Sequence, residues 1–99
     1  MIAVDQRHVV ANDGTRIGYQ VRGTSGPAVV LANGLGGTYV AFKYLYEALG
    51  GYRTICWDYR GLYTSSAPKD PLANTLVHQV DDLMTILAHE RIDDFVLVG

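Results

Sequence analysis

The sequence has little cysteine and no long apolar run, and each scarcity excludes a class of protein. The single cysteine, Cys56, cannot form a disulfide within the chain, which excludes a disulfide-built scaffold and favours a reducing compartment. No apolar run approaches the roughly 20 residues that a membrane helix needs. The first residues, MIAVDQRH, lack the charged-then-apolar pattern of a signal peptide. We therefore expect a cytoplasmic protein with no membrane partner.

An excess of positive or negative charge is also lacking. Eight basic and ten acidic side chains give a formal charge of −2, and the lysines and arginines form no cluster. A nucleic-acid partner is therefore not expected, because nucleic-acid surfaces concentrate positive charge. Apolar residues, by contrast, make up 48% of the 99 positions, which is enough for one small domain but not for two.

Turn signals and apolar patterns predict an edge hairpin and three buried strands. Residues 7–23 contain two strand-like segments around Asn12-Asp13-Gly14, a strong turn signal, and polar residues along one face place this hairpin at a sheet edge. Short apolar segments at 28–32, 53–57 and 95–98 are typical of strands that are covered on both faces.

Two helices are predicted between these strands. The first follows Thr38, a suitable capping residue, and ends at Gly50-Gly51. The second runs from about residue 74 to residue 90. Its predicted apolar face leaves Asp81 and Asp82 on the outside and consists of Leu76, Val80, Leu83, Met84 and Leu87. Alternating strands and helices predict an α/β fold with a mostly parallel sheet and an antiparallel N-terminal hairpin.

The segment VVLANGLGGTY, residues 29–39, joins a buried strand to a helix through a glycine-rich turn. Gly34-x-Gly36 at this place is also typical of a dinucleotide-binding turn, and Asp58 lies near where a ribose-binding acid is expected. That motif requires a third glycine where Tyr39 stands, and it usually opens its domain. A nucleotide-binding oxidoreductase domain is thus one hypothesis.

Three segments taken together resemble the α/β-hydrolase fold family. They are NGLGG after the first buried strand, WDYRGLYTSS after the second, and FVLVG at residues 95–99. The resemblance covers essentially all 99 residues in the right order, and it implies that strand 28–32 lies between strands 53–57 and 95–98. It also implies that the sheet is truncated after its fifth strand, with Gly99 as the first glycine of the Gly-x-Ser-x-Gly nucleophile elbow.

The resemblance implies that residues 1–99 are the N-terminal part of a single domain and hold no catalytic residue. The nucleophile, the acid and the histidine all lie beyond Gly99 in that family. We therefore expect a second polypeptide that carries the rest of the hydrolase domain, and we expect residues 1–99 alone to be inactive. A strand at 95–98 without its outer neighbour would expose an aggregation-prone edge.

The resemblance also assigns the residues of half an active site. Gly34 and Leu35 would form part of the oxyanion hole, with the backbone N–H of Leu35 as the donor. Asn33, Gly36 and Tyr63 would border the substrate. Asn33 stands where the family usually has histidine, and Tyr63 stands where glycine is usual.

Other chemically capable residues are expected to be structural. Asp58 and Arg60 match the family's Asp-x-Arg-Gly pattern and are expected to form a network between the strand end and the following loop. Ser65 lacks a nearby base and is rejected as a nucleophile. His78 and His89 are separated by about 16 Å along a helix, too far to share a metal ion. No cofactor and no metal are expected.

The function implied by the resemblance is that of a serine hydrolase acting on an ester or related acyl bond of a small-molecule substrate. Three alternatives stay open. One is a hydrolase of the same fold with an aspartate nucleophile, as in dehalogenases and epoxide hydrolases. The second is the nucleotide-binding oxidoreductase domain, and the third is a non-catalytic fragment or binding module.

Overall fold

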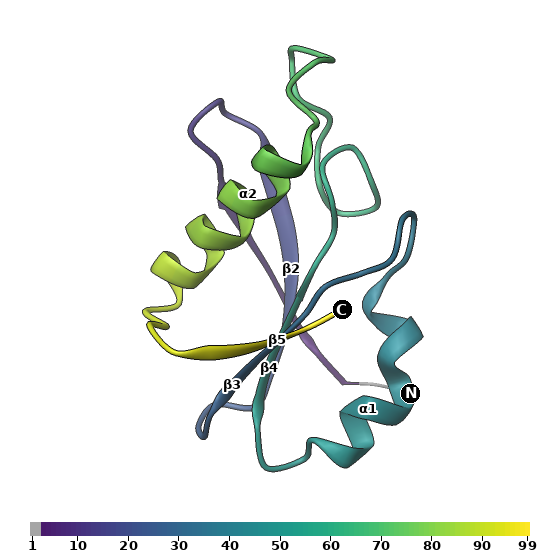
Figure 1. The fold of residues 1–99 in the computed structure, drawn as a ribbon, viewed down its shortest axis with the longest axis vertical. Coiled ribbons are helices and arrows are strands. Elements are labelled where there is room, and N and C mark those ends of the chain that lie inside the picture. The colour runs from purple at the N-terminus through teal and green to yellow at the C-terminus, as the bar shows by residue number, and fades with distance from the viewer. Residues whose placement is uncertain (1–2) are drawn as a thin grey trace.

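A computed structural model describes residues 3–99, which form a five-stranded sheet with helices on its faces (Figure 1). The strands are β1 (Asp5–Val10), β2 (Arg16–Arg22), β3 (Ala28–Leu31), β4 (Arg53–Trp57) and β5 (Phe95–Val98). The helices are α1 (Lys43–Ala48) and α2 (Leu76–His89), and a short 3-10 helix, η1 (Tyr39–Phe42), leads into α1.

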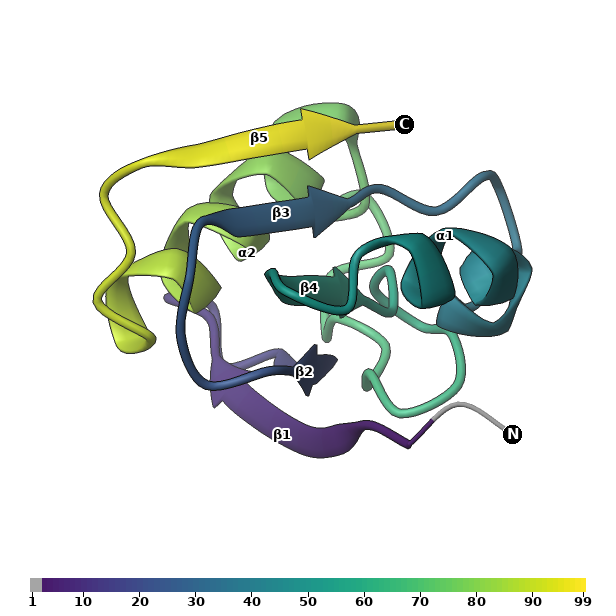
Figure 2. The same ribbon diagram turned by 90° about the horizontal axis from the view of Figure 1, so that it is seen from below.

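The sheet has the predicted topology. Its strand order is β1-β2-β4-β3-β5, with β3 parallel to both of its neighbours and the β1–β2 hairpin antiparallel at one edge. Val30 at the middle of β3 pairs with Ile55 of β4 on one side and with Leu97 of β5 on the other. Figure 2 shows the strands stacked in this order, from β5 to β1. The predicted α/β fold and the predicted place of β3 between β4 and β5 are confirmed.

The hairpin turn forms where the sequence predicts it. Gly14 has a φ of +86°, a conformation that glycine adopts without strain, and its N–H bonds to the carbonyl of Ala11 at 2.9 Å. The carboxylate of Asp13 accepts the N–H of Thr15 at 3.1 Å. An aspartate that bonds its own backbone two residues on is a common device for closing turns.

The two faces of the sheet carry separate cores because successive side chains of a strand point to opposite faces. Val30 and Ile55 pack on the face that α2 covers, where Ile86 and Leu87 are buried. Val29 and Leu31 pack on the opposite face with Tyr46 of α1. This arrangement is the three-layer organisation expected of an α/β fold.

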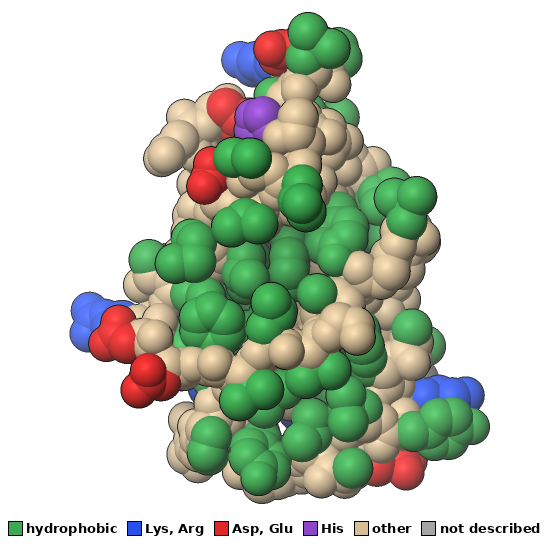
Figure 3. Space-filling view, viewed as in Figure 1, with side chains coloured by type: hydrophobic (Ala, Val, Ile, Leu, Met, Phe, Trp, Pro, Cys, Tyr) green, Lys and Arg blue, Asp and Glu red, His purple; other side chains and the backbone are tan. Residues whose placement is uncertain are grey.

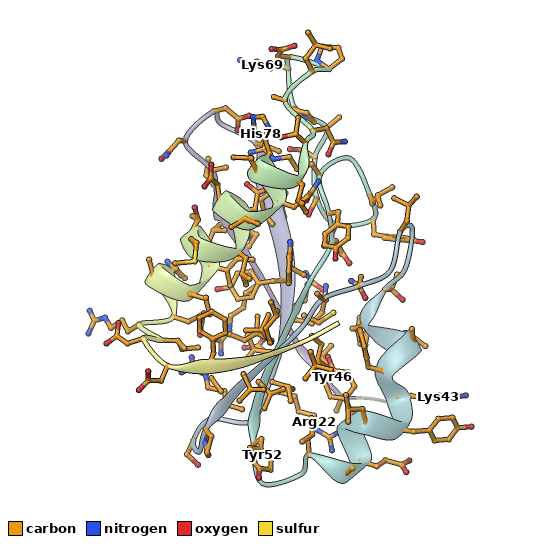
Figure 4. All side chains as sticks on the ribbon, in the orientation of Figure 1. Arg22, Lys43, Tyr46, Tyr52, Lys69 and His78 are labelled. Atoms are coloured by element: carbon orange, nitrogen blue, oxygen red, sulfur yellow. The ribbon has the colours of Figure 1, made fainter. Side chains whose placement is uncertain are left out.

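Helix α1 is held to the sheet by one buried tyrosine. Thr38 caps η1 as predicted, accepting the N–H of Val40. Tyr46 is buried against the sheet, and the Arg22 guanidinium lies 5.9 Å from its ring centroid. Figure 4 shows Tyr46 between α1 and the sheet beside Arg22, whereas Lys43 points away. The apolar body of the ring therefore fixes the helix that follows the glycine-rich loop.

The buried face of α2 differs from the predicted one. Leu83 and Leu87 are buried as expected, but Leu76, Val80 and Met84 are exposed, and Asp82 is fully buried. The physical reason is an ion pair: Arg60 reaches Asp82 from the loop after β4, so the carboxylate faces the protein interior. Burial of a charge is tolerated where it is paired and hydrogen-bonded.

Exposed apolar side chains gather on α2 and β5. We call this surface the β5–α2 face; it consists of Leu76, Val77, Val80, Met84, Phe95 and Leu97. Figure 3 shows apolar side chains covering much of this side of the molecule. No helix within residues 3–99 combines the length and the apolar character required to span a membrane. The cytoplasmic location stays a prediction.

Candidate active site

Three parallel strands end at one edge of the sheet, and the candidate site lies there. Asn33 follows β3, Asp58 follows β4 and Gly99 follows β5. The N–H of Ala32 donates to the carbonyl of Val98 at 2.7 Å, so the end of β5 is bonded to the start of the loop that leaves β3. Figure 2 shows both strands pointing the same way, with the C-terminus beside that loop. In open α/β sheets, ligands bind outside the carboxyl ends of the strands.

The loop after β3 contains a tight turn made by Gly34, Leu35, Gly36 and Gly37. The N–H of Gly37 bonds to the carbonyl of Gly34 at 2.9 Å. Gly36, the third residue of the turn, has a φ of +74°, which requires glycine. A Cβ atom at Gly34 would meet nothing within 4 Å, so the absence of a side chain at Gly34 is not required for space. The turn depends instead on the positive φ of Gly36.

Leu35 occupies the second position of this turn and is completely exposed, with 100% of its surface accessible. Its backbone N–H has no hydrogen-bond acceptor within residues 3–99. Backbone donors in folded proteins are nearly always paired unless they face solvent or a ligand. Leu35 therefore presents a free donor at the edge of the sheet, as the oxyanion assignment requires.

Asn33 anchors the loop to the neighbouring strand. Its side-chain Nδ2 donates to the carbonyl of Trp57 at 2.8 Å, and its own carbonyl accepts the hydroxyl of Tyr59. The side chain is buried, and its Oδ1 has no partner among residues 3–99. These bonds give Asn33 a structural role. A substrate contact by Asn33 stays a prediction.

Tyr63, in the loop that follows β4, meets the glycine-rich loop that follows β3. Its hydroxyl donates to the carbonyl of Gly36, which brings together two of the residues predicted to border the substrate. Tyr63 has a φ of +51°, in the left-handed region. This conformation explains why glycine is usual at the position, because a tyrosine there is strained. The ring remains 63% exposed, so a substrate contact is sterically open.

Asp58 and Arg60 are structural, but they do not form the single network that was predicted. The Asp58 carboxylate is buried and accepts hydrogen bonds from Thr64 and from the side chain of Gln20. Arg60 instead bonds Asp82. The reason is that the two side chains reach different partners: Asp58 bonds the side chain of Gln20 on β2 and the following loop, whereas Arg60 reaches α2 and the hairpin turn. A buried, occupied Asp58 is also unsuited to binding a ribose.

Ser65 and Cys56, which carry potentially nucleophilic side chains, both have structural surroundings. Ser65 is buried, accepts the N–H of Gly18 at 2.9 Å and donates to the carbonyl of Asp58 at 2.6 Å, so its hydroxyl holds the loop against β2. Burial raises the pKa of the Cys56 thiol to about 12, with a further contribution from the charge of Asp58. The thiolate is the nucleophilic form, so Cys56 is inert at neutral pH.

Tyr59 contacts the candidate site, and the sequence did not indicate it. Its hydroxyl fixes the carbonyl of Asn33, the residue at which the loop begins. Burial, and then the neighbouring Cys56, raise the pKa of Tyr59, so the hydroxyl stays a donor. The one sequence feature that could have indicated Tyr59 is its position just after a predicted strand, where side chains often contact neighbouring loops. Within residues 3–99, no three histidine, cysteine or acidic side chains are grouped so that they could hold a metal ion.

The family described as alpha/beta hydrolase fold matches residues 27–99, nearly three-quarters of the sequence. The chain belongs to the alpha/beta hydrolase fold family. The match includes the glycine-rich loop, which is therefore a hydrolase loop and not a dinucleotide-binding turn.

Individual relatives agree with this assignment. An epoxide hydrolase of Caballeronia sordidicola is 38% identical over 77 residues, covering 76% of this chain and 23% of its own length. A crystal structure of an alpha/beta hydrolase from Novosphingobium aromaticivorans is 30% identical with a TM-score of 0.88, over 100% of this chain and 36% of the other. Epoxide hydrolase A from Mycobacterium thermoresistibile is 28% identical with a TM-score of 0.84, over 98% and 31%. The sequence thus spans between 23% and 36% of these relatives.

Proposed function

We propose that this chain provides the oxyanion-binding half of the active site of a hydrolase that cleaves ester or related acyl bonds, with a serine nucleophile supplied from beyond Gly99. The observation that carries the proposal is the free N–H of Leu35, held in a braced turn of the loop whose first residue, Ala32, is bonded to the end of β5. A nucleophile on the segment after β5 would lie next to this donor. A second donor would follow the nucleophile itself.

The chemistry of acyl transfer uses such a donor twice. When the serine oxygen attacks the carbonyl carbon, the C=O electron pair moves to oxygen, and the resulting negative charge is stabilised by backbone N–H groups. Collapse of this intermediate expels the alcohol and leaves an acyl-enzyme. Water then attacks the same carbon, the charge develops again on the same oxygen, and the acid is released. The N–H of Leu35 is fixed before reaction, so no reorganisation is needed.

Epoxide hydrolysis by an aspartate nucleophile is the second candidate, and the 38% identical epoxide hydrolase favours it. In that chemistry a carboxylate oxygen attacks an epoxide carbon, the C–O bond of the ring breaks, and the alkoxide takes a proton from an acid. The product is an alkyl ester of the enzyme. Water hydrolyses this ester at its carbonyl carbon, so the Leu35 N–H serves in the second half of the reaction only.

One isotope experiment separates the two candidates. A protein that carries the whole hydrolase domain is tested with p-nitrophenyl acetate and with styrene oxide, and single turnovers are run in water enriched in ¹⁸O. An aspartate nucleophile places the label in the enzyme carboxylate and an unlabelled oxygen in the diol. A serine nucleophile places the label in the acid product and none in the enzyme. Turnover of neither substrate class would contradict the proposed hydrolase function.

We also propose that the β5–α2 face is covered by the polypeptide that supplies the nucleophile, acid and histidine. The face is apolar, and β5 pairs along one edge only within residues 3–99. Contiguous exposed apolar surface of this kind marks an interface. The length of the relatives supports a partner segment larger than the chain itself.

A further inference from the structure

We propose that Tyr63 is a positioning residue that aims the N–H of Leu35 through two linked peptide units. The inference rests on the proposed role of Leu35 as an oxyanion donor. It concerns a residue at which this chain departs from the glycine usual in its family.

The first link joins Tyr63 to the peptide between Gly36 and Gly37. The Tyr63 hydroxyl donates to the carbonyl of Gly36, and the N–H of Gly37 belongs to the same rigid peptide plane. That N–H donates to the carbonyl of Gly34 at 2.9 Å. Both ends of the plane are therefore held. Without the hydroxyl, only the Gly37 N–H holds the plane, and it rotates more easily because both flanking residues are glycines, which populate both signs of φ.

The second link joins Gly34 to Leu35. The carbonyl of Gly34 and the N–H of Leu35 share one trans peptide plane and point in opposite directions. A bond that fixes the carbonyl therefore fixes the direction of the N–H. Tyr63 thus controls the donor at a distance of two peptide planes, without touching it.

The backbone of Tyr63 is held in a conformation that its neighbours impose. Its left-handed φ of +51° is strained for a tyrosine, and such strain persists where the surroundings over-determine it. The neighbouring loop supplies those surroundings: Thr64 bonds the Asp58 carboxylate, and the N–H of Ser65 bonds the carbonyl of Leu62 at 2.9 Å. Residues on both sides of Tyr63 are anchored, so its ring is directed across to Gly36.

The test compares Tyr63→Phe, which removes only the hydroxyl, with Tyr44→Phe, an exposed tyrosine on α1 outside the site. Both are made in the protein that carries the whole hydrolase domain. Tyr63→Phe should lower kcat about threefold to tenfold with little change in KM, because one hydrogen bond in the brace is lost. Tyr44→Phe should leave both constants unchanged.

Amide hydrogen exchange provides the second readout and does not depend on activity. Tyr63→Phe should speed exchange at the Gly37 N–H, whose bond to Gly34 loses its brace, whereas Tyr44→Phe should not. Unchanged exchange at Gly37 would show that Tyr63 does not hold the Gly36–Gly37 peptide. Faster exchange with an unchanged kcat would show that this contact has no effect on catalysis. A wild-type protein without hydrolase activity would contradict the proposed function. The exchange result would still show whether Tyr63 holds the Gly36–Gly37 peptide.

Discussion

Arg60 and Asp82 form a two-pronged ion pair in the interior, with hydrogen bonds of 2.7 and 3.0 Å. Their side chains are 3% and 1% exposed. The guanidinium also bonds the carboxylate of Asp13 in the hairpin turn and the carbonyl of Ala73 just before α2. One arginine thus joins the loop after β4, the hairpin and α2, which fixes the side of the sheet opposite α1.

Replacing Asp82 with asparagine should destabilise the fold by about 3–5 kcal/mol, because it breaks a buried pair and leaves the arginine charge undercompensated. Asp81→Asn is the matched control, since the adjacent side chain is exposed and should cost within about 0.5 kcal/mol. Urea unfolding of the two variants measures the difference. Equal losses at the two positions would show that the pair does not hold α2.

Glu90, at the end of α2, is held by three donors from the sheet. Burial alone would raise its pKa, but hydrogen bonds from Tyr19 and Arg7, the charge of Arg7 and a bond from Arg53 together outweigh burial and lower the pKa below its usual 4.5. A carboxyl with a lowered folded-state pKa binds protons more readily when unfolded. Its stabilising contribution is therefore complete above about pH 4.5 and is lost as the pH falls through the folded-state value.

Glu90→Gln should lower the free energy of unfolding by about 1.5–3 kcal/mol at pH 7, the range for hydrogen bonds to charged groups. The deficit relative to wild type should shrink as the pH falls below about 4.5, where the Glu90 carboxyl of the unfolded wild-type chain takes up a proton. Urea midpoints between pH 7 and pH 3 measure this, with Glu47→Gln on the exposed side of α1 as the control. A deficit that stays constant or grows on acidification would contradict the assignment.

The sequence predicted the sheet well because its signals are local. Three short apolar segments and one Asn-Asp-Gly turn were sufficient to predict the strands and the hairpin, and the resemblance to the hydrolase fold predicted the strand order around β3. Asp82 was misplaced because helical periodicity reports only residues of the same helix, whereas its partner Arg60 is 22 residues away. The contact of Tyr63 with Gly36 was equally invisible, since it depends on a left-handed residue 27 positions after the turn that it braces.

Residues 1–99 expressed alone should self-associate. Val96 and Leu97 on β5 are exposed, and unpaired strand edges beside apolar side chains pair with other chains. Sedimentation velocity should show concentration-dependent oligomers, and Val96→Lys should reduce them because charge on an edge strand opposes pairing. Thr85→Lys on α2, outside the β5–α2 face, should not. A monodisperse monomer with protected amides at 95–98 would contradict the proposed covering of this face.

The central claim is that the backbone N–H of Leu35 stabilises the oxyanion. Leu35 is the second residue of a turn, a position that proline favours, so Leu35→Pro removes the N–H while remaining compatible with the turn. Leu35→Ala removes the exposed side chain and keeps the donor.

The deciding measurement is kcat for the two variants in the protein that carries the whole hydrolase domain, with circular dichroism showing that both are folded. Leu35→Pro should lose roughly 10²–10³ in kcat, the cost of deleting one oxyanion donor, and Leu35→Ala should lose far less. Equal losses in the two variants, or a Leu35→Pro variant with wild-type kcat, would contradict the account.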